Sequence, residues 1–345
     1  MKIIVRGTNW IGDAVMTVPA LTQLRLSFPD AHITLQSRPA AAAVFEGADF
    51  IDEVLLIKPA RSKIAGILSQ IRTVRRGKFD LGIIFTNSAE AAIVYKFGGV
   101  PLRFGYASGG RRILLNRSLP VPGWKNDRHE VYYYLELADS AIADFNGTQT
   151  GDRPEPDLRL RVAPTRLDRA MALMNELGID PAHPIVALGV GSTNSRAKRW
   201  PAERFARLAD RLATEINSNI VLVGSAEDRS VSTLVSGLTN CSPVDLCGKT
   251  TVSEAAAILA SSDLLISNDM GLAHLAPAVG TPTIVIFGPT NENTTRPFSA
   301  KADIIRKVVE CSPCMLRDCP IDHRCMTGVT VDDVFDFARN KLDLE

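Results

Sequence analysis

A segment in the last third of the chain carries the residues whose types and spacing point most directly to chemistry. An apolar run ends at Asp269, and Gly271 then admits a helix of small residues. His274 falls inside that helix, and a second apolar run follows and ends at Thr290. A helix that opens at the carboxyl edge of an α/β sheet offers unpaired N–H groups and a partial positive charge, which suits a diphosphate. The segment therefore predicts a site for an acidic nucleotide. The alternative is that Asp269 only caps the helix and His274 packs in the core.

A second polar loop, at 189–201, follows a strand of the buried type and precedes a helix that begins near Pro201. Ser192 and Thr193 have hydroxyls that can bond phosphate oxygens, and Lys198 is a mobile cation for them. The alternative is a flexible polar loop without a ligand. The loop is not a dinucleotide fingerprint, because Gly-x-Gly-x-x-Asn lacks the third glycine, and the chain has no Gly-Lys-Ser/Thr phosphate loop.

Two further carboxylates follow predicted strands. Gly7 and Gly12 permit a tight turn after the first strand, and Asp13 then falls in the first turn of a helix. We expect Asp13 to act as a general base toward a sugar hydroxyl, against the alternative that it only complements the helix dipole. Asp228 ends the segment Gly-Ser-Ala-Glu-Asp after another strand, where an acidic residue can hold a ribose hydroxyl pair or simply cap the next helix.

One predicted helix is strongly basic. The window 54–79 contains seven Lys and Arg residues and no acid. Its apolar residues recur at helical spacing, at Ile64, Ile67, Leu68, Ile71 and Val74. A basic helix face is usually only solvated, but it could also rest on anionic lipid headgroups or bind a phosphorylated acceptor.

Four of the six cysteines form a cluster after the last strong strand, close to His323. They are Cys311, Cys314, Cys319 and Cys325. Four thiolates could form a structural zinc site, although the spacing is not that of a standard zinc finger. Structural disulfides and free thiols are the alternatives. Disulfides are the weaker one, because residues 1–20 lack a signal-peptide pattern and we expect a cytoplasmic protein.

The elements that must position these residues alternate between strand and helix in both halves of the chain. Strands are expected at 2–6, 32–36, 53–57, 81–85, 102–105, 185–189, 219–223, 264–266 and 283–287. Helices are expected at 11–27, 64–76, 88–97, 129–145, 166–177, 202–216, 229–238 and 252–260, and again after Gly271. This alternation predicts mostly parallel sheets covered on both faces. Residues 146–157 are polar and rich in Gly and Pro, which predicts a linker between two domains.

Composition limits the class of protein. A chain of 345 residues is too long for one typical core. Its 39 Lys and Arg against 38 Asp and Glu argue against a nucleic-acid binder held by bulk electrostatics. No apolar run reaches the roughly 18 residues that indicate a membrane span.

In their order, these motifs resemble the ADP-heptose:lipopolysaccharide heptosyltransferases of glycosyltransferase family nine, most closely the heptosyltransferase II branch. The likeness covers nearly the whole chain, at Gly12-Asp13, Asn87-Ser88, 99–106, 198–201, 268–274 and 287–290. It implies the α/β GT-B fold, in which two Rossmann-like, doubly wound domains face each other across a cleft. The expected domains are 1–160 for the acceptor and 161–345 for the ADP-sugar, with a hinge near 146–165. The last helix could pack back on the first domain.

The resemblance also implies an activity and roles for single residues. The implied enzyme is inverting and moves L-glycero-D-manno-heptose from ADP-heptose to the heptosyl-Kdo2-lipid A inner core of lipopolysaccharide, with Asp13 as the general base. Donor binding is implied for Ser192, Thr193, Lys198, Asp228, Asp269, Met270, Gly271 and His274. Acceptor binding is implied for Asn87, Ser88, Arg103, Arg111 and Arg112. The family usually has Ser or Thr where this chain has Met270, which leaves only the backbone N–H for a phosphate contact.

No cofactor or catalytic metal is expected, because the chain contains no Asp-x-Asp motif to hold a metal-bound diphosphate; a structural zinc stays open. The expected partners are ADP-heptose and a lipid A–core acceptor at the inner-membrane surface, and no nucleic acid. We expect a cytoplasmic protein, with a peripheral contact on the inner face of that membrane left open.

Three alternatives remain. Heptosyltransferase I or another family-nine ADP-sugar transferase fits the same motifs, because these residues report the donor more than the acceptor. A non-catalytic nucleotide-sugar binder could use the same scaffold. A nicotinamide oxidoreductase is disfavoured by the missing third glycine.

Overall fold

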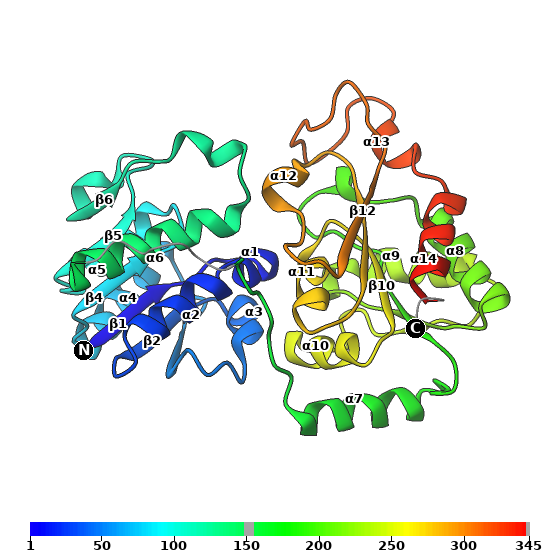
Figure 1. Cartoon of the computed structure of the whole chain (residues 1–345), viewed down its shortest axis with the longest axis horizontal. Helices are drawn as coiled ribbons and strands as arrows, with labels where there is room; N and C mark the ends of the chain where they lie inside the picture. The colour runs from blue at the N-terminus through cyan, green and yellow to red at the C-terminus, as the bar shows by residue number, and fades with distance from the viewer. Residues whose placement is uncertain (148–154, 343–345) are drawn as a thin grey trace. The chain divides into compact units, whose positions relative to one another are not determined.

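The computed structural model describes residues 1–147 and 155–342, and the chain divides into two compact units, Met1–Leu158 and Arg159–Glu345. The division falls close to the domain boundary expected after residue 160. Residues 148–154, which form most of the expected linker and part of the expected hinge, lie outside the described residues. Each unit is built on a six-stranded parallel sheet with helices on both faces (Figure 1).

The sheet of the N-terminal unit has the strand order β3-β2-β1-β4-β5-β6, and all neighbours pair in parallel. Its strands are β1 (Lys2–Arg6), β2 (His32–Ser37), β3 (Glu53–Leu56), β4 (Leu81–Ile84), β5 (Leu102–Tyr106) and β6 (Arg117–Leu119). The residues Ile3, Ile4 and Val5 of β1 are fully buried, because helices cover both faces of the sheet.

Two groups of helices cover this sheet. Helix α1 contacts α2, α3 and α6, whereas α4 packs on α5. The helices are α1 (Ile11–Met16), α2 (Val18–Ser27), α3 (Pro39–Ala42), α4 (Lys63–Gly77), α5 (Ala89–Phe97) and α6 (Glu130–Asn146). Short 3-10 turns are η1 (Ala43–Phe45), η2 (Arg111–Leu114) and η3 (Gly123–Asn126).

The expected single helix at 11–27 is wrong in one respect, because the chain breaks at Thr17 into α1 and α2. Pro19 has no N–H to donate, so a continuous helix would lose one of its bonds there. The Thr17 hydroxyl donates to the Ala14 carbonyl at 2.7 Å and satisfies part of the interrupted turn.

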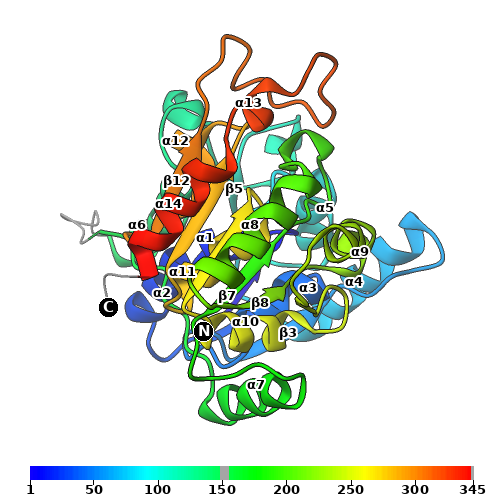
Figure 2. The ribbon, with the colours of Figure 1, turned by 90° about the vertical axis from the view of Figure 1, so that its right-hand side faces the viewer.

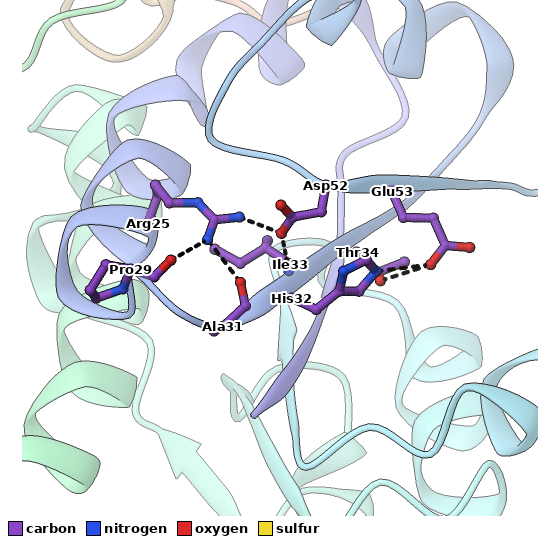
Figure 3. A network of polar contacts seen from close by, with 8 residues as sticks. All are labelled: Arg25, Pro29, Ala31, His32, Ile33, Thr34, Asp52 and Glu53. Carbon is purple, nitrogen blue, oxygen red and sulfur yellow. Dashed lines mark hydrogen bonds and ion pairs between the residues drawn. The ribbon is translucent and has the colours of Figure 1, made fainter.

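Beside β2 a polar network ties the strand to its neighbours (Figure 3). Arg25 at the end of α2 donates to the carbonyls of Pro29 and Ala31 at 3.0 and 2.8 Å and pairs with Asp52. Asp52 in turn accepts from the Ile33 N–H at 2.7 Å. One arginine therefore fixes the turn into β2 and the start of β3 together.

The sheet of the C-terminal unit has the order β12-β11-β10-β7-β8-β9, again with parallel neighbours. Its strands are β7 (Ile185–Gly189), β8 (Asn219–Leu222), β9 (Val244–Asp245), β10 (Leu264–Asn268), β11 (Thr283–Phe287) and β12 (Ala302–Arg306). Strands β6, β9 and β12 are not among the strands expected from the sequence; they are short or half-buried and lie at the sheet edges.

Helices α8, α9 and α14 form one layer over this sheet, and α7, α10 and α11 form another (Figure 2). The helices are α7 (Pro164–Glu176), α8 (Ala202–Glu215), α9 (Arg229–Leu238), α10 (Val252–Ala260), α11 (Gly271–Ala278), α12 (Glu292–Thr295), α13 (Arg324–Thr327) and α14 (Val331–Leu342). The 3-10 turns are η4 (Arg196–Lys198) and η5 (Ala226–Asp228). The last helix, α14, contacts α8 and β10 of its own unit, and a contact of this helix with the first domain stays a prediction. Within residues 1–147 and 155–342, no helix is long and apolar enough to cross a membrane.

Candidate active site

Three neighbouring strands of the C-terminal sheet, β7, β10 and β11, end at the same edge because they run in parallel. The polar residues expected to gather at that edge do meet. Lys198 lies with its Nζ atom 2.6 Å from Oδ2 of Asp269, and the Thr290 hydroxyl donates to the same oxygen at 2.7 Å. The sequence predicted that polar residues gather at this edge, and the structure adds that Lys198 and Thr290 both contact Asp269.

Asp269 is nearly buried, with 5% of its surface exposed, whereas a quarter of the Lys198 side chain is exposed. The carboxylate therefore lies at the base of the edge and the ammonium extends toward solvent. An ammonium held in this way is a preorganised cation for an anionic ligand, because the pairing fixes a long side chain that would otherwise sample many rotamers. The alternative of a helix-capping Asp269 is not what the structure shows, since α11 has Met270 at its N-cap and no side-chain cap bond.

The residue before Asp269 holds the edge together. Asn268 is fully buried, and its Nδ2 donates to the carbonyls of Val190 and Gly191 at 2.9 and 3.0 Å. Its Oδ1 accepts from the Trp200 N–H at 2.9 Å. Asn268 was not among the site residues expected from the sequence. Its position between an apolar run and Asp269 is the sequence feature that could have indicated this structural role.

The loop after β7 approaches its neighbours so closely that two of its residues must be glycine. A Cβ on Gly189 would lie 2.6 Å from the Ser267 Cβ, and one on Gly191 would lie 2.0 Å from Oδ1 of Asp228. Next in this loop, Ser192 is nearly buried, and Thr193 is exposed with its hydroxyl 3.3 Å from that of Ser225. Of the two hydroxyls predicted to bind phosphate, Thr193 is therefore the accessible one.

Helix α11 begins with Met270 in an extended conformation at its N-cap, and Gly271 is the first helical residue. The side chain of Met270 makes no capping bond, so no side chain at the N-cap satisfies the first N–H groups of this helix, which are the groups that a phosphate site uses. His274 is only 6% exposed, and every residue from Leu272 to Ala278 is buried. This burial favours the alternative of a packed histidine over direct contact with a donor.

Asp228 is wholly buried, and its side chain makes no cap bond to the next helix, α9, so the alternative of a cap on that helix is not what the structure shows; Asp228 belongs instead to the turn η5. Its Oδ2 accepts from the N–H and the hydroxyl of Ser225 at 3.0 and 2.7 Å, in a capping box. A carboxylate with no exposed surface does not reach a ribose in this arrangement. The expected ribose contact of Asp228 is therefore at odds with its burial.

In the N-terminal unit, Asp13 lies in the first turn of α1, directly after the carboxyl end of β1, and is half-buried. Burial first, and the charge of Asp13 next, raise the pKa of the Tyr134 phenol in α6 well above its usual range. The phenol therefore stays protonated. The carboxylate is at the edge where ligands bind in this fold, as a base would need to be.

Three of the expected acceptor-binding residues lie at the carboxyl ends of β4 and β5. Asn87 is exposed, and its Oδ1 accepts from Arg111 at 3.0 Å and from the Tyr133 hydroxyl at 3.1 Å. Ser88 caps α5 by accepting from the Ala91 N–H at 3.3 Å. Arg112 is exposed in η2, and its contact with an acidic acceptor stays a prediction.

In the structure, the side chains of Arg103 and Arg111 donate hydrogen bonds to other groups of the protein. Arg111 is 1% exposed, and it donates to the carbonyls of Tyr106 and Thr86 as well as to Asn87. Arg103 is at the start of β5, the edge opposite the site, and donates to the carbonyls of Leu114 and Val100. Burial lowers the pKa of both guanidinium groups. The prediction that these two residues contact an acceptor is at odds with this geometry, because Nε and Nη1 of each guanidinium group already donate to backbone carbonyls.

The cysteine cluster holds free thiols in this structure. Across the part of the chain that the structure describes, which includes all six cysteines, no group of three or more His, Cys, Asp or Glu residues is arranged to hold a metal ion. The geometry thus gives no support to a structural zinc.

A sequence model of glycosyltransferase family 9 (heptosyltransferase) matches residues 67–324. The chain belongs to this family. Lipooligosaccharide heptosyltransferase 2 of Campylobacter jejuni subsp. jejuni serotype O:2 is 26% identical over 99% of this chain and 98% of its own length. Lipooligosaccharide heptosyltransferase 2 of Haemophilus influenzae is 29% identical, with 89% of each chain covered. The solved structure of Escherichia coli ADP-heptose lps heptosyltransferase II superimposes with a TM-score of 0.82 at 24% identity, over 99% of this chain and 98% of that one.

Membership in family 9 makes the protein a glycosyltransferase, as the motifs predicted. The structural likeness identifies the two six-stranded units as the paired α/β domains of the GT-B fold. The family and the fold expected from the sequence are both confirmed.

Proposed function

We propose that this enzyme transfers L-glycero-D-manno-heptose from ADP-heptose to the heptosyl-Kdo2-lipid A inner core of lipopolysaccharide, with inversion at the anomeric carbon. The observation that carries the proposal is the Lys198 ammonium, held 2.6 Å from the nearly buried Asp269 at the edge where the β7 loop and α11 begin. Relatives named heptosyltransferase 2, aligned over nearly the full chain, support the choice of sugar and acceptor.

The C-terminal unit supplies what the leaving diphosphate needs. As the bond between the anomeric carbon and the phosphate oxygen breaks, negative charge grows on ADP. Lys198, the Thr193 hydroxyl and the backbone N–H groups at the start of α11 are groups that stabilise such charge. Because their positions are set before the ligand arrives, little reorganisation is required during the reaction.

Asp13 of the N-terminal unit is the proposed general base. The acceptor hydroxyl gives its proton to the Asp13 carboxylate while its oxygen attacks the anomeric carbon and ADP departs with the bonding electron pair. A single displacement of this kind inverts the configuration. Neither a metal nor a cofactor is needed in this scheme, because cationic and N–H groups of the protein carry the charge stabilisation.

An acceptor panel with ADP-heptose tests the proposal. We expect product from heptosyl-Kdo2-lipid A and little or none from Kdo2-lipid A. Product only from the Kdo-terminated acceptor would replace the proposal by a heptosyltransferase I activity. Binding of ADP-heptose without transfer to either acceptor would support the non-catalytic binder instead.

We also propose a peripheral contact with anionic lipid through α4 and the segment before it. All seven basic residues of this surface are exposed: Lys58, Arg61, Lys63, Arg72, Arg75, Arg76 and Lys78. Two apolar side chains one helical turn apart project among them, Ile64 with 72% and Leu68 with 47% of their surface exposed. Cations around exposed aliphatic groups suit a bilayer surface, where charge attracts the protein and the apolar groups enter the headgroup layer.

Sedimentation of the full-length protein with phosphatidylglycerol-containing vesicles tests this contact. The double variant Ile64→Ser and Leu68→Ser should lower the bound fraction several-fold, and so should Arg72→Gln with Arg76→Gln. Leu26→Ser, at a position in α2 that is 76% exposed, is the matched control and should bind as the wild type does. Unchanged binding of both double variants would refute the proposed surface.

A further inference from the structure

The segment from Lys307 to His323, between β12 and α13, contains three of the clustered cysteines; we refer to residues 307–323 as the cysteine loop. Few of its large apolar side chains pack against the rest of the unit. Its large apolar side chains are mostly in solvent, with exposed fractions of 76% for Val308, 60% for Met315, 46% for Leu316 and 63% for Ile321. What fixes this loop must therefore be polar contacts with the rest of the unit.

Most of those contacts go to the turn that carries Lys198. The Ala197 N–H donates to the Arg317 carbonyl at 2.9 Å. The Ser195 hydroxyl, itself nearly buried, lies 3.3 and 3.2 Å from the carbonyls of Leu316 and Arg317. The Nε2 atom of His323 lies 2.6 Å from the Ala197 carbonyl oxygen. Because a carbonyl oxygen can only accept a hydrogen bond, this nitrogen is the donor. Both backbone groups of Ala197, one residue before Lys198, are thus held by the cysteine loop.

The same loop is fastened to the end of β11. The Met315 N–H donates to the Pro289 carbonyl at 2.8 Å, and the Ser312 hydroxyl donates to the Gly288 carbonyl at 2.5 Å. Gly288 is also where α13 comes closest, since a Cβ there would lie 2.3 Å from Sδ of the fully buried Met326. The cysteine loop therefore connects two segments that flank Asp269 from opposite sides, the Lys198 turn and the strand end that leads to Thr290.

We propose that the cysteine loop is a brace that holds the Lys198 ammonium at the donor site, and that His323 is its principal positioning residue. The proposal rests on the proposed function, because it assigns a purpose to the position of Lys198. Removing the His323 bond leaves the carbonyl of Ala197 without its donor and frees the turn to shift. A displacement of Lys198 by even about an ångström would weaken its contact with a diphosphate, since such contacts depend steeply on geometry.

The helix that follows His323 carries a buried cysteine. Burial first, and then the charges of Cys311, Cys314 and Cys319, raise the pKa of the Cys325 thiol in α13.

Titration calorimetry with ADP on the full-length enzyme tests the brace without relying on transfer. For His323→Ala we expect the Kd for ADP to rise about tenfold, and for His323→Gln, which retains an N–H donor at similar reach, we expect a rise of less than threefold. In transfer assays we expect the KM for ADP-heptose to rise and kcat to fall, because Lys198 also stabilises the charge that grows on the leaving diphosphate, while the KM for the acceptor stays within about twofold of the wild type. His183→Ala is the matched control, because His183 is a half-buried histidine that contacts Asn217 and Asp180 rather than the Lys198 turn, and it should leave the Kd for ADP and the KM for ADP-heptose unchanged.

A second comparison asks whether the effect passes through Lys198. In a Lys198→Ala background, His323→Ala should lower ADP affinity by less than threefold, because there is no longer an ammonium to position. If His323→Ala proves too unstable to purify, Ser195→Ala carries the same test with a smaller expected loss of about threefold. Wild-type affinity in a folded His323→Ala protein, or an equal loss with and without Lys198, would overturn the brace. A wild-type enzyme that fails to bind ADP would instead overturn the proposed function itself.

Discussion

The close approach of the β7 loop to Asp228 can be tested by adding one methyl group, in the substitution Gly191→Ala. A Cβ at this position would lie 2.0 Å from Oδ1, 2.1 Å from Cγ and 2.5 Å from Cβ of Asp228. Ordinary contacts begin at about 3.4 Å, so either the loop or the aspartate must move by about an ångström or more. Both are buried against the sheet, and the flexible end of a side chain is not available to yield, because Asp228 is fixed by its capping box.

The expected cost follows from two physical effects. Overpacking of a well-packed site costs about 1–3 kcal/mol. If Asp228 moves, its cap on the Ser225 N–H is lost as well, at about 1 kcal/mol. We therefore expect Gly191→Ala to lower the free energy of unfolding by about 2–4 kcal/mol. Because Ser192 and Thr193 follow directly in the same loop, affinity for ADP should fall too.

Urea unfolding of the full chain, followed by tryptophan fluorescence, measures the first effect. Gly237→Ala is the control, because Gly237 lies in α9 with open space around its Cβ position; there alanine should be neutral or stabilise by up to about 1 kcal/mol. The clash itself is isolated by a double-mutant cycle with Asp228→Gly, which should show a coupling of at least about 1 kcal/mol. A Gly191→Ala protein within about 0.5 kcal/mol of the wild type, with no coupling to position 228, would refute the reasoning.

Three further outcomes are expected. Asp13→Asn should lower the rate of transfer by about 10²–10⁴-fold and leave ADP affinity within twofold, and an undiminished rate would exclude Asp13 as the base. Lys198→Met should weaken ADP binding by at least about tenfold, as expected for the loss of a charge-assisted contact, whereas an unchanged calorimetric Kd would remove Lys198 from the donor site. Brief iodoacetamide treatment at pH 8 should label the exposed Cys311 and Cys319 and spare Cys247, because burial raises the pKa of Cys247 to about 12 and leaves almost no thiolate. Peptide mass spectrometry reads out the labelling, and early modification of Cys247 would contradict its burial.

The fold could be predicted from the sequence largely because its central strands are buried on both faces. Such strands read as continuous apolar runs, and β1, β7 and β10 were located within a residue or two on that basis. The short strands at or near the sheet edges left no comparable signal, since a half-exposed strand such as β12 need not be apolar. The break between α1 and α2 was missed because the apolar spacing continued across Pro19.

The two arginines assigned to the acceptor show what residue type alone leaves undecided. Arg103 and Arg111 have the charge that an acidic acceptor needs, but their donors are taken by backbone carbonyls. In the same way, Asp228 is an acid after a strand, yet it caps a turn and is fully buried. Hydrogen-bond partners and burial are properties of the folded chain, and a local sequence pattern does not predict them.

By itself, the sequence determined the parallel α/β architecture, the edges where ligands bind and the family, because these depend on local periodicity and on short motifs at strand ends. Tertiary structure alone decided which polar groups meet there. Lys198, Asp269 and Thr290 come from three separate strand ends, and the cysteine loop reaches two of those segments through backbone carbonyls that carry no sequence signature. Their contact arises from the order of strands in the sheet and from the paths of the loops between them, which only the packing of the whole unit sets.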